Sequence, residues 1–152
     1  MASFTFNGMN ELSATFAQLS QLTDEDKMNV LMPAAKLLVE RQRQMIERLF
    51  NRRTGDLADS LTIRQESGED GAYAHIYLKG KHRGSSTGKR KGKRRSNGRY
   101  SGTNAEVGYI LEFGSPRIAA RHWMETANEE AEDEVVAAEQ AAWDDLITQK
   151  GL

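Results

Sequence analysis

The sequence contains no cysteine, so disulfide bonds and thiolate metal sites are excluded. No apolar run approaches the length of a membrane span, and the N-terminus lacks the basic-then-apolar pattern of a signal peptide. We therefore expect a soluble protein that stays in the compartment where it is made. Proline occurs only twice in 152 residues. Pro33 predicts a kink or a fresh start within a helix, and Pro116, after Ser115, predicts a turn.

Motifs for catalysis are also lacking. The three histidines, His75, His82 and His122, do not have the spacing of metal ligands, and no GxSxG motif or Cys/His pair supplies a nucleophile. The segment "GSSTGKRKGK" (residues 84–93) looks like a phosphate-binding loop. However, three residues separate its first two glycines where four are required, and arginine follows its lysine in place of serine or threonine. We therefore expect a protein that is not an enzyme and that uses no metal or cofactor.

A chain of 152 residues is expected to form one domain with a substantial core, spanning residues 1–152.

The charges are segregated along the chain, although the formal net charge is only −1. Residues 79–102, "KGKHRGSSTGKRKGKRRSNGRYSG", contain ten of the 21 Lys and Arg and no acid. Residues 125–145 contain nine acids and no base. This separation favours contacts with partners or neighbouring copies over bulk attraction to nucleic acid.

Two helical patterns occupy the N-terminal third. Residues 1–22 carry Met9, Leu12, Phe16 and Leu19 at steps of three and four, which predicts a short amphipathic helix. The sequence "TDED" follows, with a threonine N-cap and an aspartate three residues later. Residues 33–50 form the most regular apolar stripe, and we interpret "RQRQ" (residues 41–44) as its solvated outer face.

Strand-like alternation follows. "LTIRQ" (residues 61–65) and "AYAHIYL" (residues 72–78) alternate with a period of two, and "ESGEDG" between them predicts a turn. In the second strand, residues 72, 74, 76 and 78 share one face. Residues 79–102 contain no segment that can bury a face, so we interpret them as a basic arm on the domain. "EVGYILEFG" (residues 106–114) is then expected to resume as a strand.

The last element is predicted to be a long helix from about Ala119 to Gln149. The predicted fold class is therefore α+β, with a small antiparallel sheet packed between a central helix and the long C-terminal helix, and with the basic arm inserted between strands. The apolar stripe of the last helix comprises Ala127, Ala131, Val135, Ala138, Ala142 and Leu146.

Two stretches resemble a known family. "RRTGDLADSLTI" (residues 52–63) resembles the "RTGxLRxSI" segment of small tailed-phage proteins at the head–tail junction, known as tail-completion, minor tail or neck proteins. "GYILEFGSPRIAARHWMETA" (residues 108–127) resembles their second signature, an aromatic-rich strand ending in "EFGT", then "PARPFLRPA" and a long charged helix. Ser115 stands where the family has threonine, and Ala119 and His122 stand where it prefers prolines.

The resemblance implies a structural virion protein that forms a ring around the DNA channel and joins the tail to the filled head. Its implied location is the neck of the virion, after assembly in the host cytoplasm. The implied partners are other copies of the chain in a ring of six or twelve, a portal-side connector, adaptor or stopper protein, and a tail terminator or tail tube protein. DNA in the lumen is a further partner, bound without sequence preference, and no membrane is involved.

The motif residues are expected to specify the fold rather than a reaction site. Thr54 and Gly55 are interpreted as a tight corner, Phe113 as a core anchor, and Glu112 as an ion-pair partner of Arg117 or Arg121. The full set of motif residues is Thr54, Gly55, Leu57, Ser60, Glu112, Phe113, Gly114, Arg121 and Trp123.

The basic arm allows four interpretations: contact with DNA phosphates, docking on the connector or a tail protein, binding to the acidic last helix of the next copy, or a solvated loop. An alternative class of function is a nucleic-acid-binding module that uses this arm. The candidate contact residues of the arm are Lys79, Lys81, Arg83, Lys89, Arg90, Lys91, Lys93, Arg94, Arg95 and Arg99. The candidate inter-subunit acidic face comprises Glu129, Glu132, Asp133 and Glu139.

Overall fold

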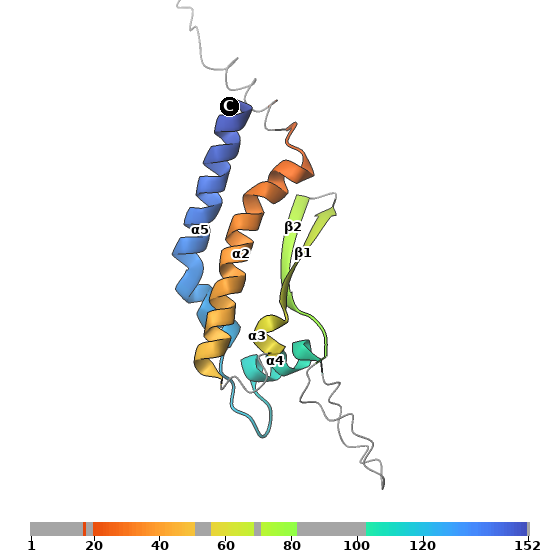
Figure 1. Cartoon of the computed structure of the whole chain (residues 1–152), viewed down its shortest axis with the longest axis vertical. Coiled ribbons are helices and arrows are strands. Elements are labelled where there is room, and N and C mark those ends of the chain that lie inside the picture. Colours follow the sequence, from red (N-terminus) through yellow and green to blue (C-terminus); the bar gives the residue numbers. More distant parts are fainter. Residues whose placement is uncertain (1–16, 18–19, 51–55, 69–70, 82–102, 152) are drawn as a thin grey trace, which may run out of the picture.

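The chain folds as a two-stranded antiparallel hairpin and two long helices, with the first long helix between the hairpin and the second (Figure 1). The computed structural model describes residues 17, 20–50, 56–68, 71–81 and 103–151. The elements in chain order are α2 (Asp24–Leu49), α3 (Asp56–Asp59), β1 (Leu61–Gly68), β2 (Gly71–Leu78), α4 (Asn104–Phe113) and α5 (Trp123–Lys150).

Helix α2 begins at the predicted N-cap. The Thr23 hydroxyl accepts from the backbone N–H of Asp26, at 3.2 Å, and the Asp26 carboxylate accepts from the backbone N–H of Thr23, at 3.0 Å. The helix continues through Pro33 to Leu49, so the predicted fresh start at the proline is wrong. The first turns of α2 are inclined to the rest of the helix in Figure 1. The helix predicted in residues 1–22 lies almost entirely outside the described residues.

An ion pair joins the start of α2 to the end of α5. The Lys150 ammonium lies 3.0 Å from Asp26 Oδ2. The hydrogen bond from Lys150, followed by those from Thr23, lowers the pKa of the Asp26 carboxyl from its usual range. Because the folded state depresses this pKa, the contact contributes above the pKa that Asp26 has in the unfolded chain, and acid weakens it. The two long helices are thus held together at the end where α2 begins.

The hairpin confirms the predicted pair of strands. Leu61 pairs with Leu78 and Ile63 with Ile76, and β1 extends further than predicted, to Gly68. On β2 the side chains at even positions from 72 to 78 are half-buried, whereas those at 73, 75 and 77 are exposed. The alternation therefore identified the face of β2 that packs toward α2.

The strand predicted at residues 106–114 is wrong, because this segment belongs to helix α4. The Thr103 hydroxyl caps the helix by accepting from the Glu106 backbone N–H at 3.2 Å. Residues four positions apart share the same burial, as in a helix: Gly108 and Glu112 are buried, whereas Tyr109 and Phe113 are exposed. The arm therefore lies between a strand and a helix rather than between two strands.

The predicted layer order is also wrong. The sheet was expected between the two long helices, but α2 occupies that place and packs on the hairpin on one side and on α5 on the other. Helix α5 begins at Trp123, later than predicted, and its predicted apolar stripe is confirmed. Within that stripe, Ala127, Ala131 and Leu146 are buried and the other three residues are half-buried. The small alanine side chains allow α5 to approach α2 closely.

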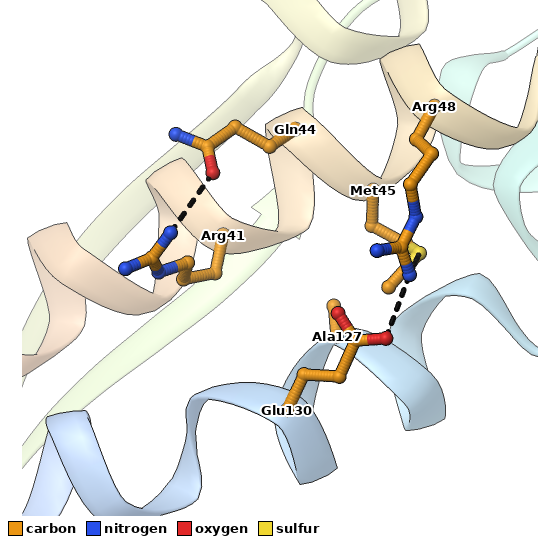
Figure 2. Close-up of a pocket in the computed structure, with 6 residues that line it drawn as sticks. All are labelled: Arg41, Gln44, Met45, Arg48, Ala127 and Glu130. Carbon is orange, nitrogen blue, oxygen red and sulfur yellow. Dashed lines mark hydrogen bonds and ion pairs between the residues drawn. The ribbon is translucent and has the colours of Figure 1, made fainter.

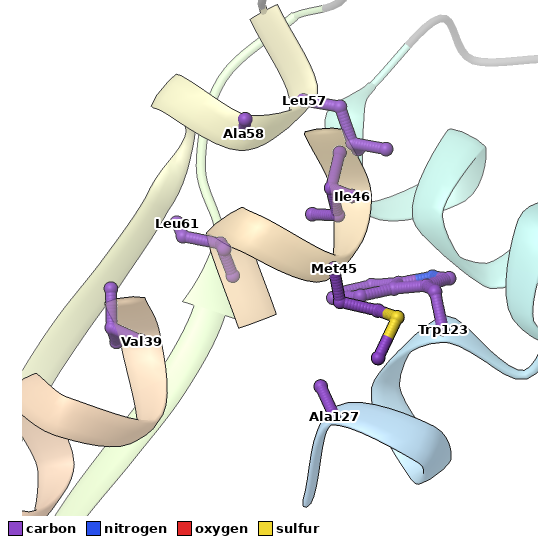
Figure 3. Packing of buried hydrophobic residues seen from close by; sticks show 8 residues of the cluster. All are labelled: Val39, Met45, Ile46, Leu57, Ala58, Leu61, Trp123 and Ala127. Atoms are coloured by element: carbon purple, nitrogen blue, oxygen red, sulfur yellow. The ribbon is translucent and has the colours of Figure 1, made fainter. Parts of the chain in front are cut away.

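The core lies where α2, α3, the start of β1 and the start of α5 meet (Figure 3). None of the described helices combines the length and the apolar character needed to cross a membrane. The buried core cluster comprises Val39, Met45, Ile46, Leu57, Ala58, Leu61, Trp123 and Ala127.

Candidate functional site

Trp123, from the second motif, anchors the end of the molecule where the two motifs meet. Its side chain is 0% exposed, and its indole N–H donates to the Gly108 carbonyl oxygen at 3.0 Å. It shares a core cluster with Leu57 and Ala58 of the first motif, as Figure 3 shows. The two motifs, distant in sequence, therefore pack against one another through the last turns of α2.

Leu57 and Ser60, the described residues predicted from the first motif, are both buried. The Ser60 hydroxyl donates to the Leu57 carbonyl oxygen at 2.7 Å and so closes the turn between α3 and β1. This arrangement agrees with the expectation that motif residues specify the fold. Thr54 and Gly55, predicted as the corner after the central helix, lie outside the described residues.

Two glycines of the second motif occupy positions that a side chain would disturb. A Cβ on Gly108 would lie 2.1 Å from Leu78 Cδ1, so glycine lets α4 approach β2. Gly114 ends α4 with φ 81° and ψ 179°, a conformation that is essentially restricted to glycine. A Cβ there would also lie 2.9 Å from the backbone nitrogen of Ala120. The glycine of the "EFG" motif therefore sets the reversal between α4 and α5.

Glu112 caps the N-terminus of α5. Its side chain is only 5% exposed, and its two oxygens accept from the backbone N–H groups of Met124, at 2.7 Å, and Glu125, at 3.1 Å. The carboxylate thereby satisfies two free donors at the positive end of the helix. The predicted ion pair with Arg117 or Arg121 is wrong, since both arginines are exposed and neither pairs with Glu112.

Phe113 is the second correction in this motif. It was expected to be a core anchor, but it is 63% exposed and packs instead against Tyr109, with the ring centroids 4.8 Å apart. The helical period explains the difference, because the helix turns Gly108 and Glu112 inward and Tyr109 and Phe113 outward. Trp123 is the buried aromatic anchor at this position in the fold.

Among the described residues, one group of side chains has metal-ligating chemistry. Ligand atoms of Glu112, His122 and Glu125 lie within 4.8 Å of one another, so His122 does come close to two acids. Both Glu112 oxygens already accept backbone N–H groups, and the positive end of the α5 dipole opposes a cation there. His122, with φ 46°, lies 3.1 Å from the Glu125 carboxylate through Nδ1. The arrangement is best explained as a polar cap on α5.

A groove opens beside this cap, between β2, α4 and the start of α5. We call it the aromatic groove; its volume is about 250 Å³. Its buried lining includes Leu61 and Trp123. The large side chains that line it and remain exposed are Tyr77, Tyr109, Phe113 and Met124.

Gln42 lines the same groove and corrects the interpretation of "RQRQ" as a solvated face. It is 3% exposed, and its amide nitrogen donates to Asn128 Oδ1 at 2.8 Å. Its Oε1 atom is buried and has no hydrogen-bond partner among the residues that the structure describes. The signal was visible in the sequence, because Gln42 lies four residues after Leu38 and three before Met45 on the apolar stripe.

Six of the nine acids of α5 form two groups. Glu130 and Glu134 turn toward α2, where Arg48 lies 2.7 Å from Glu130 and Arg41 Nε lies 3.0 Å from Glu134 (Figure 2 shows the Arg48 pair). The ion pair with Glu130 raises the pKa of the Arg48 guanidinium. The four acids predicted as an inter-subunit face, Glu129, Glu132, Asp133 and Glu139, are exposed and have no cationic partner among the described residues.

Backbone and side-chain contacts join the two segments from which the basic arm extends. Lys81 forms an antiparallel bridge with Thr103, and Asn104 donates through its amide nitrogen to the Lys79 carbonyl oxygen at 2.8 Å. Lys81 and Thr103, the described residues on either side of residues 82–102, therefore lie side by side. Lys79 and Lys81 are exposed. The other predicted arm contacts lie outside the described residues: Arg83, Lys89, Arg90, Lys91, Lys93, Arg94, Arg95 and Arg99.

A scan against protein-family models found no match, and searches of curated proteins and of solved structures found none either.

Proposed function

We propose that this chain is a structural, ring-forming component of the head–tail junction of a tailed phage. In this role it seats the tail on the DNA-filled head and surrounds the DNA channel in six or twelve copies. The observation that carries the proposal is the meeting of the two motif segments around Trp123, with Leu57 from one and Gly108 from the other in contact with the same core. The order of helix, first motif, hairpin, second motif and closing helix also agrees with the resemblance.

The distribution of charge supports self-association. Four acids on the outer face of α5 have no cationic partner from the described part of their own chain. The arm contains ten Lys and Arg side chains, and the Lys81–Thr103 bridge ties it to the fold beside α4. In the proposed ring, the arm of each copy binds the acidic face of the next copy. Such head-to-tail contacts use two different surfaces and generate a ring when the rotation closes. A portal-side connector and a tail terminator or tube protein are the other proposed neighbours.

Deleting residues 83–99 is expected to leave the fold intact and to impair the joining of tails to filled heads. The fold survives because the Lys81–Thr103 bridge and the Asn104 hydrogen bonds hold the base of the arm. A matched variant keeps the length of the arm but replaces its bases with serine and glutamine. Thermal unfolding followed by circular dichroism checks the fold, and electron microscopy counts joined particles against free heads and tails.

If charge carries the contact, the neutralised arm fails as completely as the deletion. Normal joining with both variants would identify the arm as a solvated loop. The alternative function makes a different prediction. A monomer that binds duplex DNA tightly, with an affinity that falls steeply as salt rises, would identify a nucleic-acid-binding module and contradict a junction role.

A further inference from the structure

The aromatic groove has a volume that suits side chains of a bound polypeptide. Its volume of about 250 Å³ lies below the roughly 300–1,000 Å³ of most small-molecule pockets. It suits one or two large apolar side chains from another polypeptide. Tyr109 and Phe113 remain largely exposed beside it, and aromatic side chains of this kind are enriched at protein–protein interfaces.

Gln42 adds a polar requirement to this groove. A buried amide oxygen without a partner costs free energy unless a donor reaches it. Turning the amide over would place two acceptor oxygens, Gln42 Oε1 and Asn128 Oδ1, against one another, so the orientation with Oε1 unpaired is favoured. The occupant should therefore combine apolar side chains with a hydrogen-bond donor, as a peptide segment does through its backbone N–H groups or its hydroxyls.

Residues 1–16, "MASFTFNGMNELSATF", have this chemistry. They contain three phenylalanines and four hydroxyl side chains, and their only charged side chain is Glu11. This segment precedes the N-terminal end of α2, where Asp26 pairs with Lys150. The groove lies further along α2, at Gln42. The distance from Asp24 to Gln42 along α2 is about 27 Å at 1.5 Å per residue. Along that path the hairpin and α5 already cover two sides of α2.

We propose that the aromatic groove of one copy binds the N-terminal segment, residues 1–16, of a second copy. Phenylalanine side chains of the segment occupy the apolar part of the groove, and a donor of the segment binds Gln42 Oε1. The inference deepens the proposed ring and rests on its self-association. Each copy then contacts a neighbour twice, through the arm on the acidic face and through the N-terminal segment in the groove.

Cysteine cross-linking tests this pairing cleanly, because the chain has no native cysteine. One full-length variant carries Phe4→Cys, Phe6→Cys or Met9→Cys, and the other carries Tyr109→Cys. The matched control is Val136→Cys on α5, which is 59% exposed against 64% for Tyr109. A small added tag on one variant resolves the mixed dimer on a gel after mild oxidation.

The expected result is a mixed disulfide dimer between at least one N-terminal cysteine and the Tyr109→Cys chain, and its loss to background with the Val136→Cys chain. Adding Gln42→Met to the Tyr109→Cys chain should lower the yield of the dimer without lowering thermal stability. An unchanged yield would overturn the contact with Gln42. Cross-linking only within one copy, in chains that carry both cysteines, would overturn binding by a second copy.

Sedimentation of the unmodified chain separates this inference from the proposed function. Rings without any cross-link from the three N-terminal positions would overturn the groove interaction and leave the ring standing. A specific cross-link in an assembly that stops at two copies would support the groove interaction and contradict the ring. Monomers without a cross-link would overturn the groove interaction, whereas the ring is tested in the presence of its connector or tail partners.

Discussion

Trp123→Ala should unfold the protein or lower its free energy of unfolding by about 3–5 kcal/mol, the usual cost of removing a large buried aromatic side chain. The side chain is fully buried at the point where α2, α3 and α5 meet. The substitution leaves a cavity there and also removes the only side-chain donor to the Gly108 carbonyl oxygen among the described residues. Urea denaturation followed by circular dichroism measures the loss.

Phe113→Ala is the matched control, because Phe113 is a large aromatic residue of the same motif that is mostly exposed. Its expected effect on unfolding is within about 0.5 kcal/mol, as for most surface substitutions. The contrast separates the two candidates for the core anchor. A large loss with Phe113→Ala and a small one with Trp123→Ala would contradict the packing described above.

Glu112→Ala should be the second most damaging substitution, with an expected loss of about 2–3 kcal/mol. It removes the acceptor of two backbone N–H groups at the start of α5 and leaves both donors partly buried. Glu112→Gln keeps one amide oxygen as an acceptor, so its loss should be smaller. The free energy of unfolding from urea titration provides the comparison.

Glu129→Ala is the control for charge, because Glu129 is an exposed acid on the same helix without a cationic partner among the described residues. Its expected effect is within about 0.5 kcal/mol. Equal losses for Glu112→Ala and Glu129→Ala would show that the effect comes from helix propensity or net charge. In that case Glu112 would not be the cap of α5.

The elements with a long, regular pattern were predictable from the sequence. The capping pattern at Thr23 and Asp26 identified the start of α2, and the alternation in residues 72–78 identified the packed face of β2. The stripe of α5 from Ala127 to Leu146 followed from its period alone. In each case the local spacing and the tertiary packing require the same residues.

Helix α4 was not predictable in the same way. A short apolar run such as "EVGYILEFG" is compatible with either a strand or a helix, and its length does not decide between them. The decision depends on distant partners, because Trp123 reaches the Gly108 carbonyl oxygen and Leu78 packs closely against Gly108. The error carried over to Phe113 and Glu112, since a strand and a helix present different faces.

The aromatic groove required the three-dimensional structure. Its lining comes from α2, both strands, α4 and α5, so no single segment of the sequence contains it. Gln42 was the one local signal, as a polar residue within an apolar stripe. The charged and polar residues of "RQRQ" around it favour a solvated face when the sequence alone is considered.

The most direct test of the proposed role is an electron cryo-microscopy reconstruction of the neck of phage particles that contain this chain. The proposal predicts a closed ring of six or twelve copies between the portal side and the tail, with the DNA channel through its centre. Density for the chain elsewhere in the particle, or as isolated copies that do not touch one another, would contradict it.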